Sequence, residues 1–149
     1  MTADDIVRQV AKMHEKDLVM PECVNGSRFN GTYTSKIDLW VLQGTVHNHC
    51  MYGYEVKVSK PDFRMFTKWG DYMSMCNKLY FVTLEGVIED GDLPSGVGHY
   101  LATEDGLTLV KQAEHREIAF PEGIFLSLAV NRMDVKKRYI VDNDWTHKS

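Results

Sequence analysis

The sequence predicts an α+β domain of 149 residues, in which one mixed sheet is flanked by helices. Three observations predict this class. The N-terminal segment has helical spacing, several short segments have the pattern of strands, and a second helical segment lies between two groups of strands. The length suits a single domain spanning residues 1–149, whose core needs no disulfide or metal to hold it together.

The N-terminal half predicts one helix followed by three strands. Residues 3–17 carry apolar side chains at helical spacing behind two acids that favour a helix N-terminus. Residues 18–24 are a short apolar run that contains a proline, which suits an edge strand. After the polar loop 25–35, residues 36–42 and 50–59 alternate between apolar and polar positions. We expect these two strands to pair antiparallel through a hairpin.

The C-terminal half predicts a helix, a strand, a hairpin and a last helix. Residues 61–76 repeat aromatic and apolar side chains at helical spacing, with Gly70 as a candidate kink. Residues 79–84 are continuously apolar, which is typical of a central strand covered on both faces. The dipeptide Asp105-Gly106 lies between two β-rich runs and indicates a hairpin, and residues 121–133 open with proline and turn helical.

Composition favours a soluble, intracellular protein. We expect a cytoplasmic location, in a bacterial or phage-like setting. No apolar run approaches the roughly 20 residues needed to span a bilayer, so we expect no membrane association, and the N-terminus lacks the apolar segment of a secretory signal. Cys23, Cys50 and Cys76 are widely spaced, which favours reduced thiols over a disulfide framework. The formal charge is −4, yet residues 56–78 carry a local excess of +3 that suits a phosphate-bearing ligand or a solvated helix face.

Glu55 and Lys57 are the residues with the clearest chemical content. Alternation along a strand places them on one face, and Asp38 lies on the preceding strand, with 16 residues between it and Glu55. If the two strands pair, both carboxylates converge on one hard cation such as Mg²⁺ or Mn²⁺. This arrangement suits metal-assisted phosphodiester hydrolysis, in which the cation polarises the phosphate and generates hydroxide while the ammonium orients the nucleophile or offsets developing charge.

Two simpler interpretations compete with this one. A salt bridge between Glu55 and Lys57 on an exposed strand face explains the same spacing, because such patterns arise by chance. His47, His49 and Cys50 raise zinc as an alternative ligand. No second cluster at ligand spacing accompanies them, and they fall where a turn is expected, so a polar turn explains them more simply.

The element order, with Asp38 followed by Glu-x-Lys, resembles the PD-(D/E)XK nuclease superfamily, whose restriction-endonuclease-like core runs αβββαβ. The stretch "EVKVSKPDFRMFTKWGDYMSMCNKLYFVTLEG", followed by "LPSGVGHYLATEDGLTLVKQA", is similar to MmcB-type DNA-repair proteins of this superfamily. In these, Glu-x-Lys-x-Ser-x-x-Asp-Phe precedes a Lys-Trp…Tyr…Cys segment, an aromatic strand, a Leu-Pro loop and a Gly-containing hairpin. The similarity covers residues 36–113.

This resemblance implies that Asp38 and Glu55 are metal ligands and that Lys57 is the catalytic lysine, with Mg²⁺ or Mn²⁺ as the cofactor. A further acid commonly completes such sites. Glu22 is the first candidate for that acid, and Glu15 is the second.

A basic and aromatic set on and before the second helix is the candidate contact to nucleic acid. Lys68 and Tyr72 lie one helical turn apart and are similar to the Gln-x-x-x-Tyr element of RecB-like nucleases. A surface lysine explains Lys68 equally well, and packing within the surrounding aromatic residues explains Tyr72 better than a contact to nucleic acid. Lys60 and Arg64 complete the set.

The implied activity is metal-dependent hydrolysis of DNA, single- or double-stranded, as an endonuclease or exonuclease in DNA repair or in phage or mobile-element DNA metabolism. A homodimer is compatible with this prediction. The alternative is a catalytically inactive nuclease-fold module that binds nucleic acid or a repair partner. A third hypothesis, an unrelated α+β binding domain, predicts that Asp38, Glu55 and Lys57 are scattered in space.

Overall fold

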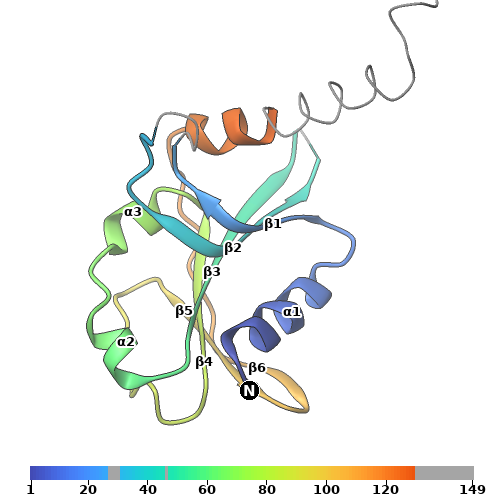
Figure 1. Ribbon diagram of the computed structural model, residues 1–149. Helices are drawn as coiled ribbons and strands as arrows, with labels where there is room; N and C mark the ends of the chain where they lie inside the picture. The colour runs from blue at the N-terminus through green and yellow to red at the C-terminus, as the bar shows by residue number, and fades with distance from the viewer. Residues whose placement is uncertain (27–30, 46, 130–149) are drawn as a thin grey trace, which may run out of the picture.

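The computed structural model describes residues 1–26, 31–45 and 47–129, and its centre is one six-stranded mixed sheet. The first three strands form an antiparallel meander, the next two add in parallel, and the last returns antiparallel (Figure 1). The strands follow chain order across the sheet: β1 (Leu18–Val24), β2 (Lys36–Gly44), β3 (His49–Lys57), β4 (Lys78–Thr83), β5 (Gly98–Thr103) and β6 (Gly106–Lys111). The predicted mixed sheet of the α+β class is confirmed.

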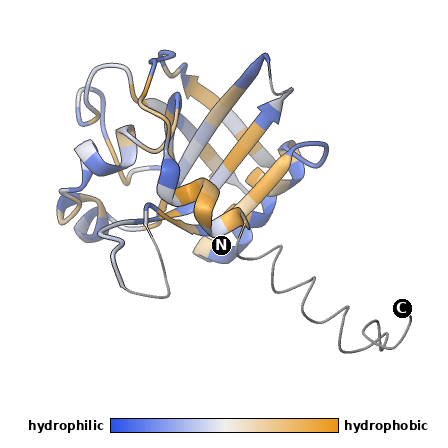
Figure 2. Cartoon of the chain, turned by 90° about the horizontal axis from the view of Figure 1, so that it is seen from above, coloured by the Kyte–Doolittle hydropathy of each residue, from blue (hydrophilic) through white to orange (hydrophobic). Residues whose placement is uncertain are grey.

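Helices cover both faces of this sheet, and the sheet separates two apolar cores. The helix α1 (Ala3–Met13) packs on one face through Ile6 and Val10. On the other face lie α2 (Lys60–Arg64), α3 (Trp69–Met73) and the helical residues 122–129. Figure 1 shows α1 and the α2–α3 pair on opposite sides of the strands. In Figure 2 the apolar residues concentrate on the strands, while hydrophilic ones predominate in the outer turns.

The first helix is shorter than the sequence predicts. A capping box between Thr2 and Asp5 starts it, but it ends at Met13 instead of residue 17. The chain turns there because the His14 ring packs inward, with its Nε2 2.6 Å from the Tyr54 hydroxyl and its Nδ1 2.8 Å from Asp17. This buried pairing outweighs the helical preference of the residues that follow.

The single helix predicted over residues 61–76 is wrong, because two short helices occupy this segment. Ser59 caps the first, since its hydroxyl accepts a hydrogen bond from the Asp62 amide. Gly70 lies inside α3 and is not the break. The break falls at residues 65–68, where Phe66 turns toward Phe81 on β4, with ring centroids 5.2 Å apart. Packing against the sheet therefore sets the path of this segment.

The remaining elements follow the predictions. The strand with Pro21 is an edge strand, β4 is buried in the middle of the sheet, and a turn at residues 104 and 105, directly before Gly106, joins β5 to β6. The three cysteines are free thiols. Of the helix predicted over residues 121–133, residues 122–129 are helical and the end lies outside the described part. Among the residues the structure describes, no helix has the length and apolar character that a bilayer crossing requires.

Candidate functional site

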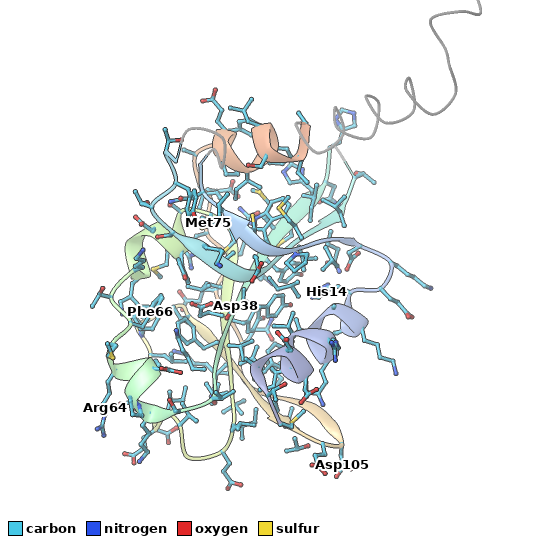
Figure 3. All side chains as sticks on the ribbon, viewed as in Figure 1. His14, Asp38, Arg64, Phe66, Met75 and Asp105 are labelled. Carbon is cyan, nitrogen blue, oxygen red and sulfur yellow. The ribbon has the colours of Figure 1, made fainter. Side chains whose placement is uncertain are left out.

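The hairpin of β2 and β3 brings the two predicted metal ligands together. Leu39 pairs with Tyr54, so the next opposed positions along these antiparallel strands are Asp38 and Glu55. The Asp38 amide donates to Oε1 of Glu55 at 3.3 Å, and the Val56 amide donates to Oδ2 of Asp38 at 2.7 Å. Here the carboxyl groups accept hydrogen bonds from backbone amides of the opposite strand. Figure 3 shows Asp38 near the centre of the molecule.

The chemical state of Glu55 follows from its burial. Its side chain is almost fully enclosed, with a relative exposure of 4 %. Burial, followed by the hydrogen bond to the Asp38 carboxyl and the charge of Asp38, raises the pKa of Glu55 to about 9, while Lys57 and Tyr72 oppose the shift. Without a cation, the Asp38–Glu55 pair therefore keeps a proton on Glu55 at neutral pH.

Lys57 stands beside this pair on the same face of β3. Its ammonium lies 3.6 Å from Oε2 of Glu55, and its side chain is 18 % exposed. The ammonium also lies 5.1 Å from the centroid of the Phe66 ring, a cation–π contact in which the face of the ring attracts the positive charge of Lys57. The salt bridge of the simpler interpretation is present, but it is buried beside Asp38 and is not on an exposed strand face.

Tyr72 and Lys68 reach the same region from α3 and its N-cap. The Tyr72 hydroxyl donates to the Lys36 carbonyl at 2.7 Å. Burial and the neighbouring charge of Glu55 raise the pKa of Tyr72. The Lys68 ammonium donates to the Thr34 carbonyl. Tyr72 is thus buried and packed, as the simpler alternative held, although it also borders the candidate site.

The other predicted residues lie elsewhere. Glu22 lies on β1 at the level of Asp38, because its neighbours Pro21 and Cys23 pair with Leu39 and Ile37. Its φ is 50°, and its side chain is 68 % exposed, with a carboxylate oxygen 3.8 Å from the Lys36 ammonium. Glu15 is exposed in the turn after α1. Lys60 pairs with Glu89 at 4.0 Å, and Arg64 lies on the outer side of α2, away from Asp38 (Figure 3). These four do not join the cluster of Asp38, Glu55 and Lys57.

A pocket of about 420 Å³ opens over the site. Glu55 and Lys57 line it from the sheet, and Tyr72 and the N-cap residue Lys68 line it from α3. Asp38, whose carboxylate accepts from the Val56 amide beside Glu55, is not among the lining residues. Sequence reasoning missed the other contributors. They are the segment 33–36 and residues 62, 65, 66 and 67.

Side-chain hydrogen bonds hold the 31–35 loop that forms one wall of this pocket. The Asn25 carboxamide accepts from the amides of Thr34 and Ser35 and donates to the Thr34 hydroxyl. Asp71 accepts from Ser35 Oγ at 2.5 Å and from Thr34 Oγ1 at 3.0 Å. The Asn, Ser and Thr content of this loop was the only signal in the sequence, and it indicated a turn without naming the partner on α3.

The donor set fits a hard divalent cation of the magnesium type. Within residues 1–26, 31–45 and 47–129, no group of three or more His, Cys, Asp or Glu side chains is placed to hold a metal ion. Asp38 and Glu55 would hold it alone, and Mg²⁺ is commonly held by one or two carboxylates, with water and substrate phosphates as further ligands. The carboxyl of Asp38 helps to keep a proton on Glu55. A bound divalent cation would offset the negative charge of both carboxyl groups and so take the place of that proton.

Comparisons with known proteins agree with this fold. A solved structure of a protein of unknown function from Silicibacter pomeroyi aligns with a TM-score of 0.66 and 17 % sequence identity, covering 99 % of this chain and 96 % of that one. No curated protein matches the sequence. The family model described as DNA repair protein MmcB-like matches residues 35–134, which include Asp38, Glu55 and Lys57. The chain therefore belongs to the MmcB-like family of DNA repair proteins.

Proposed function

We propose that this protein is a metal-dependent nuclease that hydrolyses DNA phosphodiester bonds in DNA repair, with Asp38, Glu55 and Lys57 as its catalytic group. The family supports a role in DNA repair. The observation that carries the nuclease proposal is the pairing of the two carboxyl groups across β2 and β3, with the Lys57 ammonium 3.6 Å from Glu55, beneath an open pocket.

Each residue has a distinct part in the proposed reaction. Asp38 and Glu55 would hold Mg²⁺ or Mn²⁺, which polarises the phosphate and lowers the pKa of a water when bound. Lys57 presents its ammonium where negative charge develops on the phosphate, and Phe66 fixes the direction of that ammonium. Tyr72 ties α3 to β2 at Lys36 and so maintains the wall beside Glu55.

Cleavage of labelled oligonucleotides tests this proposal. The full chain is incubated with single-stranded, duplex and branched DNA in Mg²⁺, in Mn²⁺ or in chelator. We expect metal-dependent cleavage that falls by about 10²–10³-fold or more in Asp38→Asn and Glu55→Gln. Both substitutions keep the side-chain size and the oxygen that accepts a backbone hydrogen bond, so both variants are expected to fold.

Glu104→Gln is the matched control, because it makes the same chemical change at an exposed position in the β5–β6 turn. Cleavage by Glu55→Gln at the rate of this control would contradict the proposal, as would cleavage that persists in chelator. If every DNA is bound and none is cleaved in either metal, the inactive nucleic-acid-binding module replaces the nuclease.

A further inference from the structure

The rim of the pocket carries apolar side chains that phosphate chemistry does not require. Met65 is 79 % exposed and Tyr33 is 41 % exposed, and both line the pocket above Glu55 and Lys57. They come from separate segments, the 65–68 connection between α2 and α3 and the 31–35 loop. An exposed ring and thioether at the mouth of a polar site are suited to contact the faces of bases.

The two walls that carry these side chains are tied to each other. Lys68 donates from the 65–68 connection to the Thr34 carbonyl, and Asp71 on α3 accepts from the hydroxyls of Thr34 and Ser35. Because these contacts join the walls at the two residues directly after Tyr33, they hold the mouth at a defined width. A ligand must fit between the walls without spreading them.

The reactive groups lie at the bottom of this pocket. Glu55 is almost fully buried, and the Lys57 side chain is only slightly more accessible. A phosphate must therefore descend between the walls to reach them. In a duplex the base faces are stacked on one another, whereas an unpaired strand exposes them to aromatic side chains.

We infer that the pocket takes a single unpaired DNA strand, whose backbone passes Lys57 and Lys68 while a base flanking the scissile phosphate stacks on Tyr33. This inference rests on the proposed function, because it takes the phosphodiester to bind at Glu55 and Lys57. Met65 covers the neighbouring base from the other segment. Lys68 is placed to meet a phosphate at the mouth.

Binding and cleavage measured side by side test the inference. Fluorescence anisotropy in chelator compares a labelled single-stranded oligonucleotide with the same sequence as a blunt duplex, for wild type, Tyr33→Ala, Tyr33→Phe and Phe120→Ala. Tyr33→Ala is expected to weaken single-strand binding by about 5- to 150-fold, the effect of losing one base–aromatic stack. Tyr33→Phe keeps the ring and is expected to keep most of the affinity.

Phe120→Ala is the control, because it removes an exposed ring that does not line the pocket. Preference for the single strand, lost in Tyr33→Ala alone, supports the inference. Equal or tighter binding of the duplex overturns it, and so does a Tyr33→Ala variant that binds like the Phe120→Ala control.

Single-turnover cleavage in Mn²⁺ separates this inference from the proposed function. If duplex DNA is cut faster than single-stranded DNA, and the cutting is lost in Glu55→Gln, the inference fails while the nuclease proposal stands. If no DNA is cut but single-strand binding depends on the Tyr33 ring, the nuclease proposal fails while the pocket retains its assigned ligand.

Discussion

Replacing Glu55 by Gln changes how the stability of the metal-free protein depends on pH. The native protein holds a proton on Glu55 up to a pKa of about 9, whereas the unfolded chain releases it near the usual value of 4.5. The native state thus binds more protons between these values, so its stability falls as the pH rises through that window. Gln carries no titrating proton, and its amide can donate to Asp38 as the protonated carboxyl does.

The size of the effect follows from the two pKa values. Within the window one proton contributes about 1.4 kcal/mol per pH unit, so from about pH 6 to pH 8 wild type loses about 3 kcal/mol more than Glu55→Gln. For a chain of this length that corresponds to a difference of about 5–10 °C in Tm. The difference in Tm is the change in Tm of wild type between the two pH values minus the change in Tm of Glu55→Gln between the same pH values.

Urea and thermal unfolding in chelator, at several pH values across this range, measure the difference. The comparison with Glu55→Gln cancels the titration of every other group that behaves alike in both proteins. Parallel stability profiles for the two proteins would contradict this prediction, because they would mean that Glu55 is ionised in the native state and is not coupled to Asp38.

Two further substitutions separate catalysis from stability. Lys57→Met keeps an unbranched side chain of similar length but removes the ammonium over the Phe66 ring, so single-turnover DNA cleavage should fall by about 10²–10³-fold while thermal unfolding shows a folded protein. Unchanged cleavage would remove Lys57 from the mechanism. Tyr54→Phe removes the hydroxyl 2.6 Å from His14 on the opposite face of the sheet, so the free energy of unfolding in urea should fall by about 1–3 kcal/mol. The folded variant should cleave DNA like wild type, and loss of cleavage would show that this face is coupled to the site.

The sheet and its central residues could be predicted from the sequence because strand alternation has a period of two. Once residues 36–42 and 50–59 are joined by a short connection, the antiparallel register brings Asp38 opposite Glu55, and alternation places Lys57 on the same face. The central place of residues 79–84 follows from their unbroken apolar character. These inferences needed only local pattern and the length of the connection.

The path of residues 61–76 and the positions of Arg64 and Glu22 could not be predicted from local sequence, because they depend on contacts between residues that are distant in the chain. Residues 61–76 have helical spacing, but Phe66 packs on Phe81 of β4, and this contact separates α2 from α3. Arg64 accordingly faces away from the site, although it is close to Lys68 in the sequence. The positive φ of Glu22 on the edge strand, and its outward contact with Lys36, had no local signal.

The proposed mechanism requires Asp38 and Glu55 to hold one divalent cation between them. Titration of the full chain with Mn²⁺, followed by electron paramagnetic resonance of the unbound ion, measures this binding. We predict one bound Mn²⁺ per chain in wild type and loss of that binding in Asp38→Asn and Glu55→Gln. Binding should tighten as the pH rises, because the cation displaces the proton on Glu55. Equal binding by wild type and Glu55→Gln, or a folded wild-type protein that binds no Mn²⁺, would contradict the claim.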